Sequence, residues 1–131
     1  MDINQALYTH LSTYAGLVAL CGKRIYPLTL PQEPTLPAVT YQRVSGARMQ
    51  AFGGSVGVAR PRYQVTAWAL TFVAAREIAT QVRAALDKYS GALGGAGGVQ
   101  TDATILNEID MMDTDTGWYY VVQDYELWHA E

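Results

Sequence analysis

Charged residues are scarce in this 131-residue sequence. Asp, Glu, Lys and Arg make up 16% of it, whereas soluble domains average about 25%. Hydrophobic residues make up 50%, and nine residues are tyrosines. The cores of protein–protein interfaces are also poor in charge and rich in aromatic side chains. The composition therefore favours a chain whose surface is partly covered by a partner.

Cysteine and long apolar runs are scarce too. The single Cys21 excludes an internal disulfide framework and is expected to be a small buried hydrophobe at a helix end. No apolar run reaches the roughly 18 residues of a membrane span, and the N-terminal MDINQ lacks the basic region of a signal peptide. With a net charge of -3, nothing general favours membranes or nucleic acids. We expect one domain, residues 1–131, that is made and used inside a cell or leaves it by lysis.

Three short motifs suggest catalysis, but none has the context that the chemistry needs. The GGSVG at 53–57 matches a hydrolase nucleophile elbow but leads into a strand instead of a helix. The DTG at 115–117 has the wrong flanks for an aspartic protease and is typical of a turn. The glycine-rich 91–98 follows a helix and has no Lys-Ser or Lys-Thr after it, as a phosphate loop would. We predict no catalytic residue and no cofactor.

Metal binding has little support in the sequence. Asp110, Asp113 and Asp115 lie close together, but an EF-hand loop that starts at Asp110 lacks the glycine at its sixth position. One cysteine and two distant histidines do not make a zinc site. We predict no metal site, although a weak calcium site at the aspartates stays open.

Prolines are concentrated in one segment, YPLTLPQEPTLPAVTY at residues 26–41. Each proline fixes φ, removes a backbone donor and pushes the preceding residue toward extended geometry. The segment can therefore be neither a helix nor an inner strand, and it is predicted to be a stiff, extended connector. It is either a loop between two packed elements or a rigid arm that lies against something outside its own fold.

Hydrophobic periodicity predicts two helices and four strands. The predicted helices span residues 3–20 and 72–89, and the predicted strands span 38–45, 62–69, 99–111 and 117–128. Two segments between them are predicted to be irregular: 46–61 as a long loop or mobile hairpin tip, and 91–98 as a flexible link. The fold class is α+β, with two helices packed on one face of a mainly antiparallel four-stranded sheet in the order α-β-β-α-β-β.

Side-chain patterns within these elements predict the core. In the strand 62–69, alternation directs Tyr63, Val65, Ala67 and Ala69 inward. Thr71 is a suitable N-cap for the helix that follows.

Charges are sorted along the chain. Residues 23–62 contain Lys23, Arg24, Arg43, Arg48, Arg60 and Arg62 but one acid, Glu33, whereas residues 99–131 contain eight acids and no lysine or arginine. The two sets either meet within one subunit or join one subunit to the next, head to tail, as in a ring.

Three segments in a fixed order resemble a known family. They are RIYPLTLPQEPTLPAVTYQRVSG, RYQVTAWALTFVAAREIATQVRAAL and DTDTGWYYVVQDYELWH. Nearly the whole chain resembles the small tail-completion or tail-terminator proteins, minor tail proteins of long-tailed phages, prophages and gene-transfer agents. The glycine-rich 91–98 departs from the pattern.

The resemblance implies a virion tail protein that is not an enzyme and is assembled in the host cytoplasm. Such proteins form a ring, commonly a hexamer, at the head-proximal end of the tail tube, where they stop tube polymerisation and give the head connector a joining surface. The implied partners are other copies of the chain, the tube protein and the connector protein, with DNA only in transit through the lumen and no membrane.

Within this hypothesis the loop 46–61 is our candidate for the contact with the tube or with the head connector protein. The proline-rich segment and the strand edges are our candidates for the subunit interface. The contact residues expected in and beside the loop are Arg48, Phe52, Arg60 and Arg62. The expected interface residues are Pro31, Pro34, Pro37, Arg43, Asp113, Asp115, Trp118 and Trp128.

Two other functions stay open from the sequence. A small α+β enzyme or ligand-binding domain would hold convergent titratable groups in a pocket between helices and sheet. A nucleic-acid-binding protein would use Arg48, Arg60 and Arg62 against phosphate, with strong salt dependence.

Overall fold

A computed structural model describes the backbone of residues 2–51 and 54–130, and the side chains of 2–45 and 59–129. Three helices and six strands follow one another along the chain. They are α1 (Ile3–Thr13), α2 (Ala15–Cys21), β1 (Ile25–Pro27), β2 (Ala38–Ala51), β3 (Gly54–Ala69), α3 (Phe72–Leu86), β4 (Ser90–Leu93), β5 (Val99–Met112) and β6 (Tyr119–Ala130).

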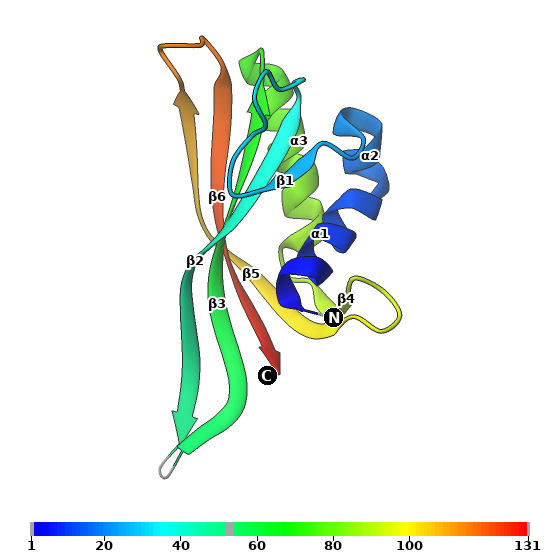
Figure 1. The fold of residues 1–131 in the computed structure, drawn as a ribbon, viewed down its shortest axis with the longest axis vertical. Helices are drawn as coiled ribbons and strands as arrows, with labels where there is room; N and C mark the ends of the chain where they lie inside the picture. The colour runs from blue at the N-terminus through cyan, green and yellow to red at the C-terminus, as the bar shows by residue number, and fades with distance from the viewer. Residues whose placement is uncertain (1, 52–53, 131) are drawn as a thin grey trace.

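The strands form one curved sheet, a half-barrel, in the order β1-β2-β3-β6-β5-β4. Only the β1–β2 pair among the described strands is parallel. The helices lie on one side of this sheet, and the β2–β3 hairpin extends past the body at one end of the long axis (Figure 1). The turn between β5 and β6 lies at the opposite end.

The predicted four-stranded sheet with two helices is wrong in its counts. Two short edge strands, β1 and β4, overlap the starts of the segments predicted to be a connector and a flexible link. Three or four residues are too few to set a hydrophobic period, so only tertiary contacts reveal them. Ile25 and Leu93 anchor the two strands in the core, with 2% and 0% of their surface exposed.

The predicted first helix is interrupted. Tyr14 has extended backbone angles and separates α1 from α2. Just before it, the Thr13 hydroxyl donates a 2.6 Å hydrogen bond to the Thr9 carbonyl, a competing bond of the kind that bends helices. The interruption turns α2, so Leu17 is buried whereas Val18 is exposed.

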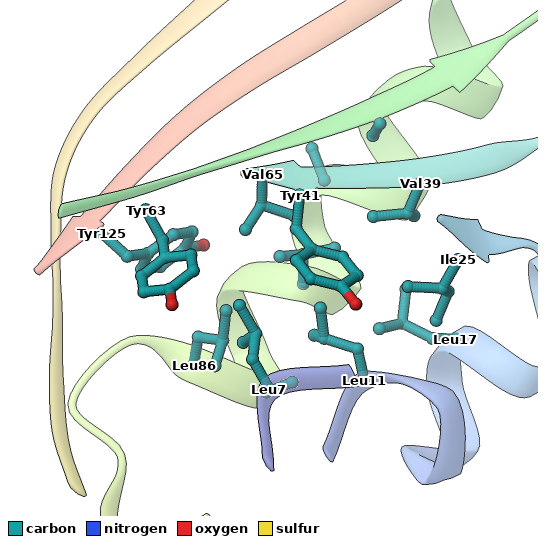
Figure 2. Packing of buried hydrophobic residues seen from close by; sticks show 14 of the residues in the cluster. Leu7, Leu11, Leu17, Ile25, Val39, Tyr41, Tyr63, Val65, Leu86 and Tyr125 are labelled. Carbon is teal, nitrogen blue, oxygen red and sulfur yellow. The ribbon is translucent and has the colours of Figure 1, made fainter. Parts of the chain in front are cut away.

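The core lies between the sheet and the helices (Figure 2). The predicted inward row of β3 is confirmed: Tyr63, Val65, Ala67 and Ala69 are all buried. The Thr71 hydroxyl accepts a 3.2 Å hydrogen bond from the Ala74 amide, which confirms the predicted cap of α3. Cys21 is buried as predicted.

The β4–β5 hairpin offers a direct test of this packing. A Cβ at Gly98 would overlap the Leu93 backbone carbonyl, whereas a Cβ at Gly95 would meet nothing within 4 Å but would sit at a φ of +83°. We expect Gly98→Ala to lower the free energy of unfolding by about 2 kcal/mol and Gly95→Ala by about 1 kcal/mol. Urea unfolding of the two variants measures the difference, and the reverse order would contradict this loop geometry.

Candidate interaction surfaces

The projecting arm, which we define as residues 46–58 of the β2–β3 hairpin, replaces the predicted loop. Its backbone continues the ladder of β2 and β3, with Arg48 opposite Ala59 and Ala51 opposite Gly54. The prediction of a hairpin tip is correct in kind, but strand pairing extends much further than predicted. Phe52 lies outside the described residues, and the side chain of Arg48 lies outside the described side chains.

Two predicted contact residues lie at the base of the arm. The Arg60 guanidinium lies over the Trp128 ring, 5.4 Å from its centroid, and Arg62 forms a 2.7 Å ion pair with Asp124 of β6. The fold thus joins Arg60 to Trp128, which the sequence assigned to a different surface. The Arg62–Asp124 pair also shows that part of the basic set meets the acidic set within one subunit.

The acidic turn, residues 113–118, lies at the other end of the molecule (Figure 1). Asp113 closes it: its carboxylate accepts from the Asp115 amide at 2.9 Å and its carbonyl accepts from the Gly117 amide at 2.7 Å. Gly117 has a φ of +74°, which glycine adopts without strain. Trp118 is half-buried beside this turn. The turn predicted from the DTG at 115–117 is confirmed, and it holds Asp113, Asp115 and Trp118 together.

The proline connector, residues 28–37, lies beside the outer edge of β2. Its ends are held by backbone hydrogen bonds, from Leu28 to the Tyr41 carbonyl at 2.8 Å and from Val39 to the Arg24 carbonyl at 2.9 Å. The Arg24 side chain donates a 2.9 Å hydrogen bond to the Pro37 carbonyl. Between these ends most residues are exposed, including Pro31, while Pro34 is half-buried. The connector is therefore a rigid exposed feature of the sheet edge.

Arg43 lies on β2 next to the buried Tyr63. Its guanidinium lies 5.7 Å from the Tyr63 ring centroid and donates to the Tyr63 hydroxyl at 3.3 Å. That hydroxyl donates to Asn4 of α1 at 2.7 Å. Burial raises the pKa of Tyr63 above its ordinary value, so the hydroxyl remains a neutral donor. Arg43 thus ties the base of β2 to the helix layer.

A buried polar cluster joins α3 to β5 and β6. Gln123, with 1% of its surface exposed, donates to the Ala79 carbonyl at 3.0 Å and to Glu108 at 2.8 Å, and accepts from Tyr125 at 2.9 Å. Arg76 of α3 reaches Glu108 at 3.2 Å. The pKa of Tyr125 is raised far above its ordinary value, chiefly by burial. Sequence reasoning missed this cluster because a glutamine in a strand carries no sign of burial.

The sheet face opposite the helices carries an aromatic pair that sequence reasoning also missed. Trp68 of β3 stacks on Tyr120 of β6 with ring centroids 4.6 Å apart. The indole of Trp68 donates a 3.0 Å hydrogen bond to the Thr40 hydroxyl. On the neighbouring β5, Ile109 and Met111 are exposed. This face is partly apolar and no described helix covers it (Figure 1).

An apolar groove of about 590 Å³ lies between α2 and α3. Its lining includes Gly16, Leu20, Phe72 and Val73, with Arg76 and Glu77 as charged lining residues. The Arg76 guanidinium is bound to Glu108 and, at 3.0 Å, to Asp110. The groove lies between helices and not between helices and sheet, where the enzyme alternative required convergent titratable groups.

No group of three or more His, Cys, Asp or Glu residues in the described part of the chain is arranged to hold a metal ion. No described helix is long and apolar enough to cross a membrane.

Comparison with known proteins gives a family and several structural likenesses. The family described as "Tail completion protein gp17" matches residues 5–130. The fold is similar to a chain in a solved structure titled "Virion of native gene transfer agent (GTA) particle", with a TM-score of 0.79 and 18% identity over 97% of this chain and 94% of that chain. No curated protein matches the chain.

Proposed function

The chain belongs to the tail completion protein gp17 family, and from this membership we propose that it forms a ring at the head-proximal end of a phage-type tail tube. The family makes it a structural tail protein of a virion and not an enzyme, so the resemblance seen in the sequence is confirmed. In the proposed role the ring stops tube polymerisation and gives the head connector its joining surface. The proposed partners are other copies of the chain, the tube protein and the connector protein.

The observation that carries the proposal is the extent of the family match. It covers residues 5–130 and therefore includes every strand and nearly all of α1. The residues that build the sheet are therefore the ones to which we assign the assembly surfaces. Termination itself needs one end that recognises the last tube ring and another end that offers no site for a further tube subunit.

The two unlike ends of the molecule support such a division. One end carries the projecting arm, with arginines at positions 48, 60 and 62 and an uncharged tip, residues 49–58. The other end carries the acidic turn with Asp113 and Asp115. We assign the arm, including Phe52, to the contact with the tube protein or with the head connector protein.

The subunit interface is proposed at the sheet edges and the features beside them. The proline connector, which leads into β2, contains Pro31, Pro34 and Pro37. Rigid segments of this kind bind with little loss of conformational entropy. Arg43, on β2, and the acidic turn with Trp118 belong to the same proposal, as does Trp128 beneath Arg60. DNA would contact the ring only while passing through its lumen.

Capping of growing tubes tests the proposed function. Purified chain is added to polymerising tube protein from the same virion, and tube lengths are measured by negative-stain electron microscopy. We expect growth to stop at one end of each tube, with a ring visible at that end, because the bound ring offers no site for the next tube subunit. Bovine serum albumin at equal concentration is the control. Tubes that grow to the same length with and without the chain would contradict the proposal.

A further inference from the structure

Two edges of the sheet are only half covered in the described part of the chain. The short β1 pairs with β2 at residues 39–41, so the outer edge of β2 has no strand partner from Gln42 to Ala51. The short β4 pairs with β5 at residues 99–102. Beyond that the Ala103 and Ile105 amides donate to the Tyr89 carbonyl and the Asp87 carboxylate. The outer edge of β5 therefore has no strand partner from Leu106 to Met112.

The open edge of β5 is rich in exposed apolar side chains. Four of its seven residues are large hydrophobics with nearly half of their surface exposed: Leu106 (47%), Ile109 (46%), Met111 (45%) and Met112 (48%). An open, apolar edge strand is a template for pairing with another chain, and monomeric proteins block such edges with charges, prolines or bulges. Here a bulge lies at the start of the open stretch, between Ile105 and Asn107, and six residues of ladder follow it.

The open edge of β2 resembles the open edge of β5, because it also has an exposed apolar side chain beside a bulge. Val44 is exposed (42%) at a bulge in β2, and the rest of the edge runs along the projecting arm. Prolines are absent from this stretch of β2, whereas the covered stretch is bordered by the proline connector. The chain thus blocks one half of this edge and leaves the other half open.

We propose that the open edge of β2 in one copy pairs with the open edge of β5 in the next copy, so that one sheet continues from subunit to subunit. This inference rests on the proposed ring and identifies the contact that builds it. Because β2 and β5 run in opposite directions in the sheet, copies related by rotation about an axis inclined to the strands present them to each other antiparallel. The contact is head to tail, the type that closes into rings.

Charge also favours this partner over a second β5 edge. The β2 edge carries Arg43 and Arg48. The β5 edge carries Glu108 and Asp110, which share the single guanidinium of Arg76, and it ends at the acidic turn with Asp113 and Asp115, so it keeps an excess of negative charge. Pairing β5 with β5 would bring two acidic edges together, which opposes association. Pairing β2 with β5 brings opposite charges together.

The positions of the open stretches fix the approximate stagger between copies. Arg43, Tyr63, Tyr125 and Ile105 form one row across the sheet. The open stretch of β2 lies on the arm side of this row and the open stretch of β5 on the side of the acidic turn. Pairing them shifts neighbouring copies along the strands by about seven residues, roughly 23 Å. A closed sheet requires such a stagger, because its strands tilt relative to the ring axis.

Two single variants and their mixture test the pairing. Ile109→Asp places a carboxylate on the β5 edge, and Val44→Asp places one on the β2 edge, so each blocks one side of the contact. By native mass spectrometry and sedimentation velocity we expect rings from the wild type and monomers from each variant alone, with association weakened about 100-fold. An equal mixture is expected to form heterodimers and no larger species, because one intact β2 edge and one intact β5 edge remain. Formation of the heterodimer also demonstrates that both variants are folded.

Control and milder variants complete the test. Val18→Asp, at an exposed position of α2 (43%), is expected to leave the rings unchanged. Ile109→Thr keeps a β-branched side chain and is expected to weaken association about tenfold. A monomeric wild type, rings that survive both Asp variants, or a mixture that fails to dimerise would each overturn the pairing. If rings depend on these edges but fail to stop tube growth, the edge pairing is supported and the proposed function is contradicted. If the edge variants still cap tubes, the proposed function is supported and the edge pairing is contradicted.

Discussion

Shortening the projecting arm is expected to abolish tube capping without unfolding the protein. In this variant residues 49–58 are replaced by Asn-Gly, which joins Arg48 to Ala59. These two residues are partners across the β2–β3 ladder, and Asn-Gly is the preferred sequence for a two-residue hairpin turn. The variant keeps the Arg60–Trp128 and Arg62–Asp124 contacts at the base of the arm.

The expectation follows from where the arm lies. It extends past the body at one end (Figure 1), and the hydrophobic core lies between the sheet and the helices, with Ala59 its nearest buried residue. The core therefore loses nothing, and we expect the thermal midpoint to change by less than about 4 °C, which corresponds to about 1 kcal/mol. The tip contributes uncharged, largely apolar residues to the proposed contact, so its removal is expected to reduce capping by at least about 100-fold, since interface hot spots are worth 2 kcal/mol or more each.

The measurement is the tube-length assay together with a thermal melt. An arm of full length in which residues 49–58 are permuted is the matched control: it restores reach and composition but not sequence, and it is also expected to cap poorly. Normal capping by the shortened variant would remove the arm from the tube contact and transfer that role to the acidic turn or the sheet edges.

Replacing Gln123 by leucine is expected to lower the free energy of unfolding by about 3 kcal/mol. The side chains are similar in size, so packing changes little, but the Ala79 carbonyl, the Glu108 carboxylate and the Tyr125 hydroxyl would each lose a partner. Each buried group left without a hydrogen bond costs about 1–3 kcal/mol. We take the total near the low end because Glu108 keeps its ion pair with Arg76.

Urea and thermal unfolding check this value, with a loss of about 10 °C expected in the midpoint. Gln64→Leu on the adjacent strand is the matched control. Gln64 is only half-buried and makes a 3.4 Å hydrogen bond to Asp124, which keeps its ion pair with Arg62. This variant is expected to change stability by no more than about 0.5 kcal/mol. Equal losses from both substitutions would show that the Gln123 cluster does not join α3 to the sheet.

The parts of the fold that were predicted correctly from the sequence depend on patterns among neighbouring residues. The alternation of Tyr63, Val65, Ala67 and Ala69 identified the inward face of β3, and Thr71 marked the start of α3. Three ordered segments also carried the resemblance to the family that the chain belongs to. These features depend on residues that lie close together in the chain, so their periodicity or order is visible in the sequence itself.

Tertiary contacts decided the rest. β1 and β4 exist because Ile25 and Leu93 find places in a core built from distant elements, and the arm is a ladder because β2 and β3 pair along nearly their whole length. The meeting of Arg60 with Trp128, the burial of Gln123 and the open edges of β2 and β5 depend on which strands become neighbours. Short strands and isolated polar residues carry too little periodic signal to specify a distant partner, so the surfaces available for assembly were set by the pairing of the whole sheet.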